Sequence, residues 1–181
     1  MSDELRRLQN DHLNFRKLLR LFEIQIDLFH GGADPDYELM RDVVHYMTQY
    51  PDRFHHPAED LVFERLLQLE PAARPLVKAI EKEHEELVAS GVKLLQLLDE
   101  VVGDAVIARE TVESSARKYL EWLLAHMEKE ESTLFPMAAQ RLTAADWADI
   151  SAAVKRHEDP LFSARVHQRY RAILEHLSKA G

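Results

Sequence analysis

Four stretches of the chain carry apolar residues spaced alternately by three and four positions, and each of these stripes contains a histidine. The clearest stripe runs from Leu5 to Phe29 and includes His12. Residues at this spacing lie on one face of an α-helix, so each stripe predicts a helix with one buried face. Four such helices bury their apolar faces by packing around a shared core. The histidines of the four stripes are, in chain order, His12, His55, His84 and His126.

Composition supports an all-α fold, because the chain has only 5 glycines and 7 prolines in 181 residues and is rich in helix formers. We expect four long helices, at about residues 3–29, 36–69, 72–102 and 109–141. Pro51 and Pro57 should distort the second helix, and Pro136 the end of the fourth. The connections are short, so neighbouring helices should run antiparallel. Residues 1–142 are therefore predicted to form an antiparallel up-down-up-down four-helix bundle.

Residues 143–181 are predicted to form a C-terminal helical extension. Thr143 and Asp146 fit the start of a further helix, which Asp159-Pro160 should interrupt before it continues to about Leu177. The apolar residues of this segment could pack on the bundle or form the interface of a homodimer. The sequence leaves both arrangements open.

Charge and composition exclude several classes of function. A formal net charge of −9 argues against nucleic acid and anionic membranes as partners, because both bind basic surfaces. The absence of cysteine excludes disulfides, thiolate metal sites and cysteine nucleophiles. The charged start of the chain and the lack of a long apolar run lead us to expect a cytoplasmic protein without a membrane segment. No phosphate loop, dinucleotide fingerprint or catalytic triad is recognisable.

A histidine is followed four residues later by a glutamate twice, at His55 with Glu59 and at His126 with Glu130. On a helix this spacing presents an imidazole and a carboxylate side by side. An unpaired carboxylate in an apolar core is strongly destabilising unless it becomes protonated, so several such groups in one core predict bound cations. Imidazole with carboxylate suits iron, zinc or manganese, and these donors alone leave the metal open. The predicted metal ligands are His12, His55, Glu59, His84, His126 and Glu130.

The order of these residues resembles the hemerythrin-like HHE cation-binding family. The resemblance covers about residues 8–142 and extends to the motifs Tyr50-Pro-Asp-Arg-Phe-His-His-Pro, Glu83-His84-Glu85 and Glu130-Glu-Ser-Thr-Leu-Phe-Pro. It implies an antiparallel four-helix bundle around two non-heme iron ions, Fe2+ or Fe3+. The two carboxylates and an oxo or hydroxo group would bridge these ions. The implied partner is a small diatomic ligand or peroxide.

The chain departs from oxygen-carrying hemerythrins in its third helix. Those proteins use five histidines, two of them one turn apart on that helix, whereas Ile80 and Val88 flank His84 here. Two six-coordinate irons offer about twelve positions, of which four imidazoles, two bridging carboxylates and one bridging oxygen fill about ten. One more position than in a carrier is then left over. Water, His56, Glu81 and Tyr119 are candidates for it.

This more open centre predicts a protein that reacts with O2, NO or peroxide, for sensing, stress defence or iron handling, rather than one that stores O2. The alternative is a helical interaction or signalling module in which the metal only holds the bundle together. Whether the chain is an enzyme stays open. A ferritin-like cage is disfavoured, because its Glu-x-x-His motif occurs once, at Glu81 and His84, with no second copy facing it. Asp60 and Glu131 are predicted to accept hydrogen bonds from the ligating imidazoles.

Overall fold

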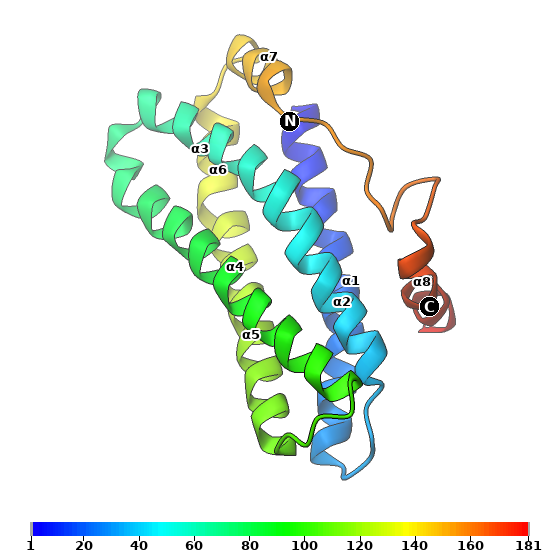
Figure 1. Cartoon of the computed structure of the whole chain (residues 1–181). Coiled ribbons are helices and arrows are strands. Elements are labelled where there is room, and N and C mark those ends of the chain that lie inside the picture. Colours follow the sequence, from blue (N-terminus) through cyan, green and yellow to red (C-terminus); the bar gives the residue numbers. More distant parts are fainter. Residues whose placement is uncertain (1, 181) are drawn as a thin grey trace.

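Four long helical rods form the body of the molecule in the computed structural model, which describes residues 2–180 (Figure 1). Successive rods run antiparallel. The first and third rods each pack against the second and the fourth, so the rods form a closed ring. The predicted all-α, up-down-up-down four-helix bundle is confirmed. In chain order the rods are α1 (Asp3–His30), α2 (Tyr37–Tyr50) continued by η1 (Pro51–His55) and α3 (His56–Leu69), α4 (Arg74–Val102), and α5 (Arg109–Lys129) continued by η3 (Glu130–Leu134) and α6 (Phe135–Arg141).

Local signals in the sequence set the ends of the rods. The side chain of Ser2 caps α1 by accepting the backbone N–H of Leu5 at 3.1 Å, and Asp36 caps α2 in the same way. After α1 the chain turns at Gly32, whose φ of 73° lies in the left-handed region that glycine adopts without steric cost. A single 3-10 turn, η2 (Pro71–Ala73), joins α3 to α4.

Two rods contain a turn of π-helix, and both turns coincide with a His-x-x-x-Glu motif. In η1 the N–H of His56 donates to the carbonyl oxygen of Pro51, and in η3 the N–H of Phe135 donates to that of Glu130. A proline stands at the second residue of α3 and of α6, where it has no N–H to continue a regular ladder. The predicted distortions are therefore widened turns within continuous rods, a feature that often marks functional sites.

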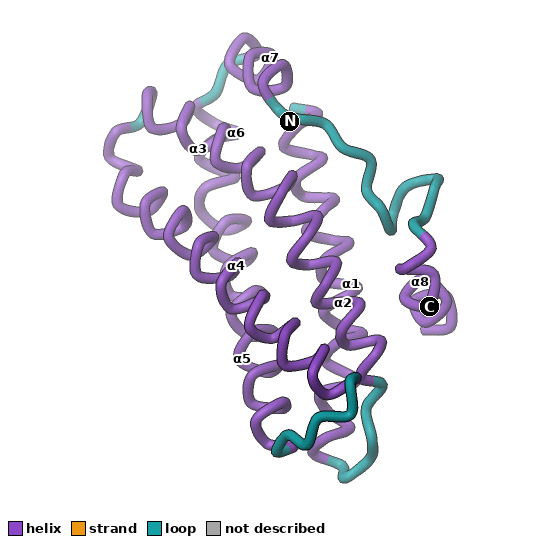
Figure 2. The backbone as a smooth tube through the Cα atoms, viewed as in Figure 1, coloured by secondary structure: helices purple, strands orange, loops and turns teal. Residues whose placement is uncertain are grey.

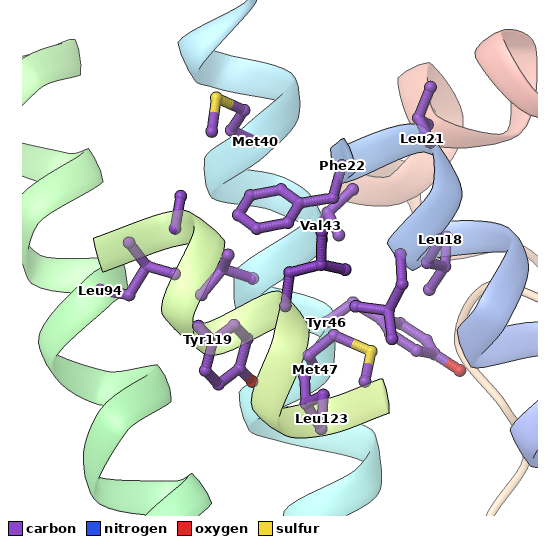
Figure 3. Close-up of a cluster of buried hydrophobic side chains, with 14 of the residues drawn as sticks. Leu18, Leu21, Phe22, Met40, Val43, Tyr46, Met47, Leu94, Tyr119 and Leu123 are labelled. Atoms are coloured by element: carbon purple, nitrogen blue, oxygen red, sulfur yellow. The ribbon is translucent and has the colours of Figure 1, made fainter. Parts of the chain in front are cut away.

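The apolar interior consists of two clusters. The larger cluster fills the half of the bundle that holds the α1–α2 and α4–α5 connections, and Figure 3 shows part of it, including Phe22 and Leu123. The smaller cluster fills the opposite half. On α4, Ile80 belongs to the smaller cluster and Leu87 to the larger one, and His84 lies between them. Along each of the other three rods, the buried apolar residues pass from one cluster to the other near the predicted histidine. A polar layer therefore crosses the whole bundle.

Beyond residue 142 the chain adds two short helices that pack on the bundle. The first, α7 (Ala144–Ala153), begins with the predicted cap, in which Thr143 and Asp146 bond each other's backbone N–H groups, and it contacts α3. The second, α8 (Arg171–Ala180), contacts α1 and α2 (Figure 1). The dimer interface predicted as the other arrangement stays a prediction. Among residues 2–180, no helix has the length and apolar character needed to cross a bilayer.

The connection between α7 and α8 differs from the expected brief interruption at Asp159-Pro160. Residues 154–167 form a long non-helical loop, followed by the 3-10 turn η4 (Gln168–Tyr170) (Figure 2). The Asp159 carboxylate accepts the backbone N–H groups of Leu161 and Phe162 at 2.7 and 2.8 Å, which bends the chain into a turn. It also accepts the hydroxyl of Tyr46 at 2.9 Å and so ties the loop to α2.

Candidate metal centre

The polar layer between the two apolar clusters contains seven buried histidine and glutamate side chains from all four rods. Each exposes 6% or less of its surface, and the two glutamates expose none. They fall into groups whose potential ligand atoms lie within 4.8 Å of one another. The seven residues, called the centre below, are His12 on α1, His55 on η1, His56 and Glu59 on α3, His84 on α4, His126 on α5 and Glu130 on η3.

The two His-x-x-x-Glu motifs each place an imidazole against its own carboxylate, as the helical spacing predicts. Nε2 of His55 lies 3.0 Å from Oε1 of Glu59. Nε2 of His126 lies 3.4 Å from Oε1 of Glu130. Each motif adjoins a π turn, since His55 ends η1 and Glu130 begins η3. The widened turns thus lie where the rods direct their polar side chains inward.

Each carboxylate lies between two groups of histidines. Oε1 of Glu59, which faces His55, also lies 3.3 Å from Nε2 of His12. Its other oxygen, Oε2, lies 3.6 Å from Nε2 of His84. Glu130 is placed alike, with Oε2 3.5 Å from Nε2 of His12 and Oε1 3.3 Å from Nε2 of His84. A carboxylate in this position can give one oxygen to each of two ions.

The structure brings a fifth imidazole, that of His56, into the centre. Its ring stacks on that of His84, with 4.3 Å between centroids and 11° between planes. It meets the ring of His126 edge-on at 5.9 Å. One ring nitrogen from each of these three histidines lies within 4.8 Å of the other two. The structure therefore places His56, one of the candidates for the extra position, beside the four predicted histidines.

The other two candidates for the extra position lie outside the centre. Glu81 forms an ion pair with Lys78 on the solvent side of α4. Tyr119 belongs to the larger apolar cluster and packs against Gly91, where an added Cβ would lie 3.0 Å from its hydroxyl oxygen. Burial raises the pKa of the Tyr119 phenol, so it stays protonated.

A second carboxylate faces the outer nitrogen, Nδ1, of every histidine in the centre. An imidazole that donates its Nδ1–H to such a group keeps the lone pair of Nε2 directed inward, as a metal ligand requires. The predicted acceptors Asp60 and Glu131 are confirmed. Four pairs are hydrogen-bonded: His12 with Glu131 at 2.9 Å, His55 with Asp11 at 3.1 Å, His84 with Asp60 at 3.1 Å and His126 with Glu83 at 3.0 Å. In the fifth, Nδ1 of His56 approaches Asp52 at 3.4 Å without a hydrogen bond.

Burial lowers the pKa values of histidines, and neighbouring carboxylates raise them. Burial alone would lower the pKa of His12, but hydrogen bonds with Glu131 and Glu59 outweigh it and raise that pKa to about 10. The same balance, with burial outweighed by hydrogen bonds to two carboxylates, raises the pKa of His84 to about 10. Burial and the adjacent His84 hold the pKa of His56 well below its usual value. A metal ion that binds here therefore displaces protons from His12 and His84.

The centre holds buried donor atoms that residues 2–180 do not satisfy by hydrogen bonding. They are Nε2 of His55 and of His126, Nδ1 of His56, both oxygens of Glu59, and Oε2 of Glu130. An unpaired buried polar atom costs about 1–3 kcal/mol, and such atoms are rare in folded proteins. All of these atoms are nitrogen or carboxylate oxygen donors in a single layer. The donor set fits two metal ions with the carboxylates shared between them.

A comparison with known families matches residues 3–138 to the Hemerythrin HHE cation binding domain. The chain belongs to this family. The match runs from α1 into α6 and includes all seven residues of the centre, whereas α7 and α8 of this HHE protein lie beyond it. No curated protein and no solved structure shows a significant match.

The six ligands predicted for this HHE domain all lie in the centre, and their role as ligands stays a prediction. Sequence reasoning left His56 open and missed the outer carboxylates of Asp11, Asp52 and Glu83. Two of these acids carry a signal, because Asp11 directly precedes His12 and Glu83 directly precedes a histidine in the same way. Each of them nevertheless bonds a histidine of a different rod.

Proposed function

We propose that the protein is a non-heme di-iron protein that binds or reacts with O2, NO or peroxide. The observation that carries the proposal is the placement of Glu59 and Glu130, each of which presents its two oxygens to two different groups of histidines. Two irons in such a site supply one-electron steps between Fe2+ and Fe3+. The residues that would hold them are His12 and His55 for one ion, His56, His84 and His126 for the other, and both glutamates for the two together.

The fifth imidazole changes the number of open positions. With His56 included, five imidazoles, two bridging carboxylates and one bridging oxygen fill about eleven of about twelve positions. His56 would then fill the extra position for which it was a candidate. One position would remain for a small ligand, beside the group with two histidines, His12 and His55, because the other group has three.

Aromatic rings enclose this two-histidine side. The ring of Phe135 stacks on that of His12 with centroids 5.3 Å apart, and Phe15 meets His55 edge-on at 4.9 Å. Both phenylalanines are almost fully buried. Apolar walls disfavour bulk water and large charged species but admit small molecules. The surroundings therefore favour a ligand of the size of O2, NO or hydrogen peroxide.

Metal analysis and an absorption spectrum of protein from iron-replete cells test the proposal. We expect two irons per chain and charge-transfer bands from a bridging oxygen to iron. These bands should be lost in His126→Ala and kept in His176→Ala, which removes a histidine of α8 far from the centre in the chain. Zinc alone, or no metal, would refute the redox function.

The alternative, a metal that only staples a signalling module, is favoured by one observation. Five imidazoles and two carboxylates bring the centre close to saturation. Azide separates the two functions, because it binds only where a position is open. A shift of the charge-transfer bands on titration with azide supports the reactive centre. Unchanged bands support the staple.

A further inference from the structure

A column of aromatic side chains runs from the centre through the larger apolar cluster to the C-terminal extension. It begins at His55, whose ring contacts that of Phe15. Phe15 lies 6.3 Å from Tyr46 and 6.4 Å from Tyr50, measured between ring centroids. The rings of Tyr46 and Tyr50 stack at 5.8 Å, and Tyr46 meets Tyr170 at 5.5 Å. Aromatic contacts thus join the centre to the extension without a gap.

Two tyrosines of this column have a proton acceptor at the hydroxyl. The hydroxyl of Tyr46, which points out of the apolar cluster in Figure 3, donates to Asp159 at 2.9 Å. The hydroxyl of Tyr170 lies 2.9 Å from Nδ1 of His45. Burial, aided by Arg169, lowers the pKa of His45, so its imidazole is neutral and can accept a proton. Because loss of an electron makes a phenol strongly acidic, a base already in place eases the oxidation of each tyrosine.

A cavity of about 300 Å³ opens beside Tyr170 at the outer end of the column. Its lining includes the exposed guanidinium groups of Arg53 and of Arg169, the second of which also pairs with Asp42 at 3.2 Å, together with the rings of Tyr50 and Tyr170. Guanidinium groups bind carboxylate-like and enediolate anions, and this volume suits a small organic molecule. The chain as a whole carries a net charge of −9, so anions are drawn to the few places where positive groups gather. This cavity is such a place, and it lies at the outer end of the column.

We infer that Tyr46 and Tyr170 relay single electrons from a small anionic reductant in this cavity to the metal centre. The relay rests on the proposed function, because its oxidant is the iron centre after oxidation by hydrogen peroxide. Tyr46 gives one electron to the centre, and its phenol proton moves to Asp159. Tyr170 then reduces the Tyr46 radical, which recovers its proton from Asp159, while the proton of Tyr170 moves to His45. One electron from the reductant and the proton held by His45 restore Tyr170.

The test uses the full-length iron-loaded protein, mixed with hydrogen peroxide and frozen for electron paramagnetic resonance. We expect an organic radical signal that narrows when the unmutated protein carries ring-deuterated tyrosine. The signal should be lost in Tyr46→Phe, which preserves the ring contacts, and kept in Tyr170→Phe. The matched control is Tyr37→Phe, which removes the hydroxyl of another α2 tyrosine that packs on Phe29 outside the column.

Steady-state kinetics test the outer half of the relay, with ascorbate as the anionic reductant. Ascorbate should accelerate peroxide consumption by the unmutated protein and by Tyr37→Phe. This acceleration should be lost in both Tyr46→Phe and Tyr170→Phe. Charge reversal at the cavity, Arg53→Glu, should raise the ascorbate concentration needed for half-maximal acceleration.

Iron content and peroxide consumption are measured in the same samples, so the two proposals fail separately. A protein that binds iron and consumes peroxide without a tyrosyl signal, or that keeps the signal in Tyr46→Phe, overturns the relay alone. Acceleration by ascorbate that survives in Tyr170→Phe overturns its outer half. A protein that binds iron but leaves peroxide unchanged also overturns the relay alone, because the relay then has no oxidant. A protein that binds no iron overturns the proposed function and the relay together.

Discussion

Removal of the outer carboxylate at Glu131 tests how the protein positions its metal ligands. This carboxylate lies 2.9 Å from Nδ1 of His12, and Arg16 holds it in place at 2.6 Å. Three residues earlier, Glu128 approaches Arg16 at 4.0 Å, and its side chain is 73% exposed against 31% for Glu131. The substitutions Glu131→Ala and Glu128→Ala therefore remove the same chemical group from neighbouring positions, but only the first frees the imidazole of His12.

Loss of such a partner weakens metal binding by about 10- to 100-fold, or about 1.4 to 2.8 kcal/mol. We expect Glu131→Ala to fall near the tenfold end, because water screens part of a carboxylate that is nearly one-third exposed. Glu131→Gln keeps an oxygen that can accept the Nδ1–H and loses only the charge, so its effect should be smaller. Glu128→Ala should change the affinity by less than about twofold.

Competition with a chromophoric chelator for Fe2+ gives the affinity of each variant, and thermal unfolding without metal checks that the fold is intact. Equal affinities for Glu131→Ala and Glu128→Ala would refute the reasoning. A larger loss in Glu131→Gln than in Glu131→Ala would refute it as well, because the order of the two variants follows from the retained acceptor oxygen.

In the metal-free protein, the free energy of unfolding should fall as pH rises from about 6.5 to about 10, as chemical denaturation across that range can measure. The reason is that the pKa values of His12 and His84, about 10 in the fold, return to about 6.5 on unfolding, so the stabilisation is complete below 6.5 and lost above 10. Gly91→Ala should destabilise the bundle by about 1–2 kcal/mol in urea titration, because overpacking outweighs the gain in helix propensity. The new Cβ would lie 2.8 Å from Cγ2 of Thr48. Tyr46→Phe should speed proteolysis of the loop after α7, because it removes a half-buried hydrogen bond worth about 0.5–1.5 kcal/mol.

Each of these outcomes has its own control. Unfolding free energies that stay level between the two pH values would mean that the buried histidines carry no protons in the fold. Ser90→Ala changes the neighbouring half-buried position of α4, so a loss equal to that of Gly91→Ala would contradict the packing argument. Tyr37→Phe should leave the rate of loop cleavage unchanged, and equal rates for the two tyrosine variants would argue against the tie to α2.

The hydrogen-bonded pairs of acid and histidine around the centre follow the same pattern in both halves of the sequence. In each half, an acid directly before the lone histidine bonds the histidine of the following motif. An acid directly after a motif's glutamate bonds the lone histidine of the other half. The first kind of pair joins Asp11 to His55 and Glu83 to His126, and the second joins Asp60 to His84 and Glu131 to His12. His56 with Asp52 has no counterpart, so the two groups of histidines are unequal.

The sequence by itself determined the four rods, their buried faces and six residues of the centre. These features are local, because residues three and four positions apart share one face of a helix wherever that helix packs. The sequence did not determine whether His56 belongs to the centre. Adjacent residues of a regular helix point about 100° apart, and only the packing of α4 and α5 around the junction of η1 and α3 brings both His55 and His56 into one layer.

Only the tertiary structure decided which acid supports which imidazole. Asp11 and His55 are 44 residues apart, and Glu83 and His126 are 43 apart, so their contact depends on the register between rods. That register follows from interdigitation of the two apolar clusters across the whole bundle, and no short spacing encodes it. The loop tied to Tyr46 has the same origin, since the half-buried carboxylate of Asp159 binds it to α2 across 113 residues of chain. The identity of the candidate ligands was thus local information, and their positioning was a property of the packed bundle.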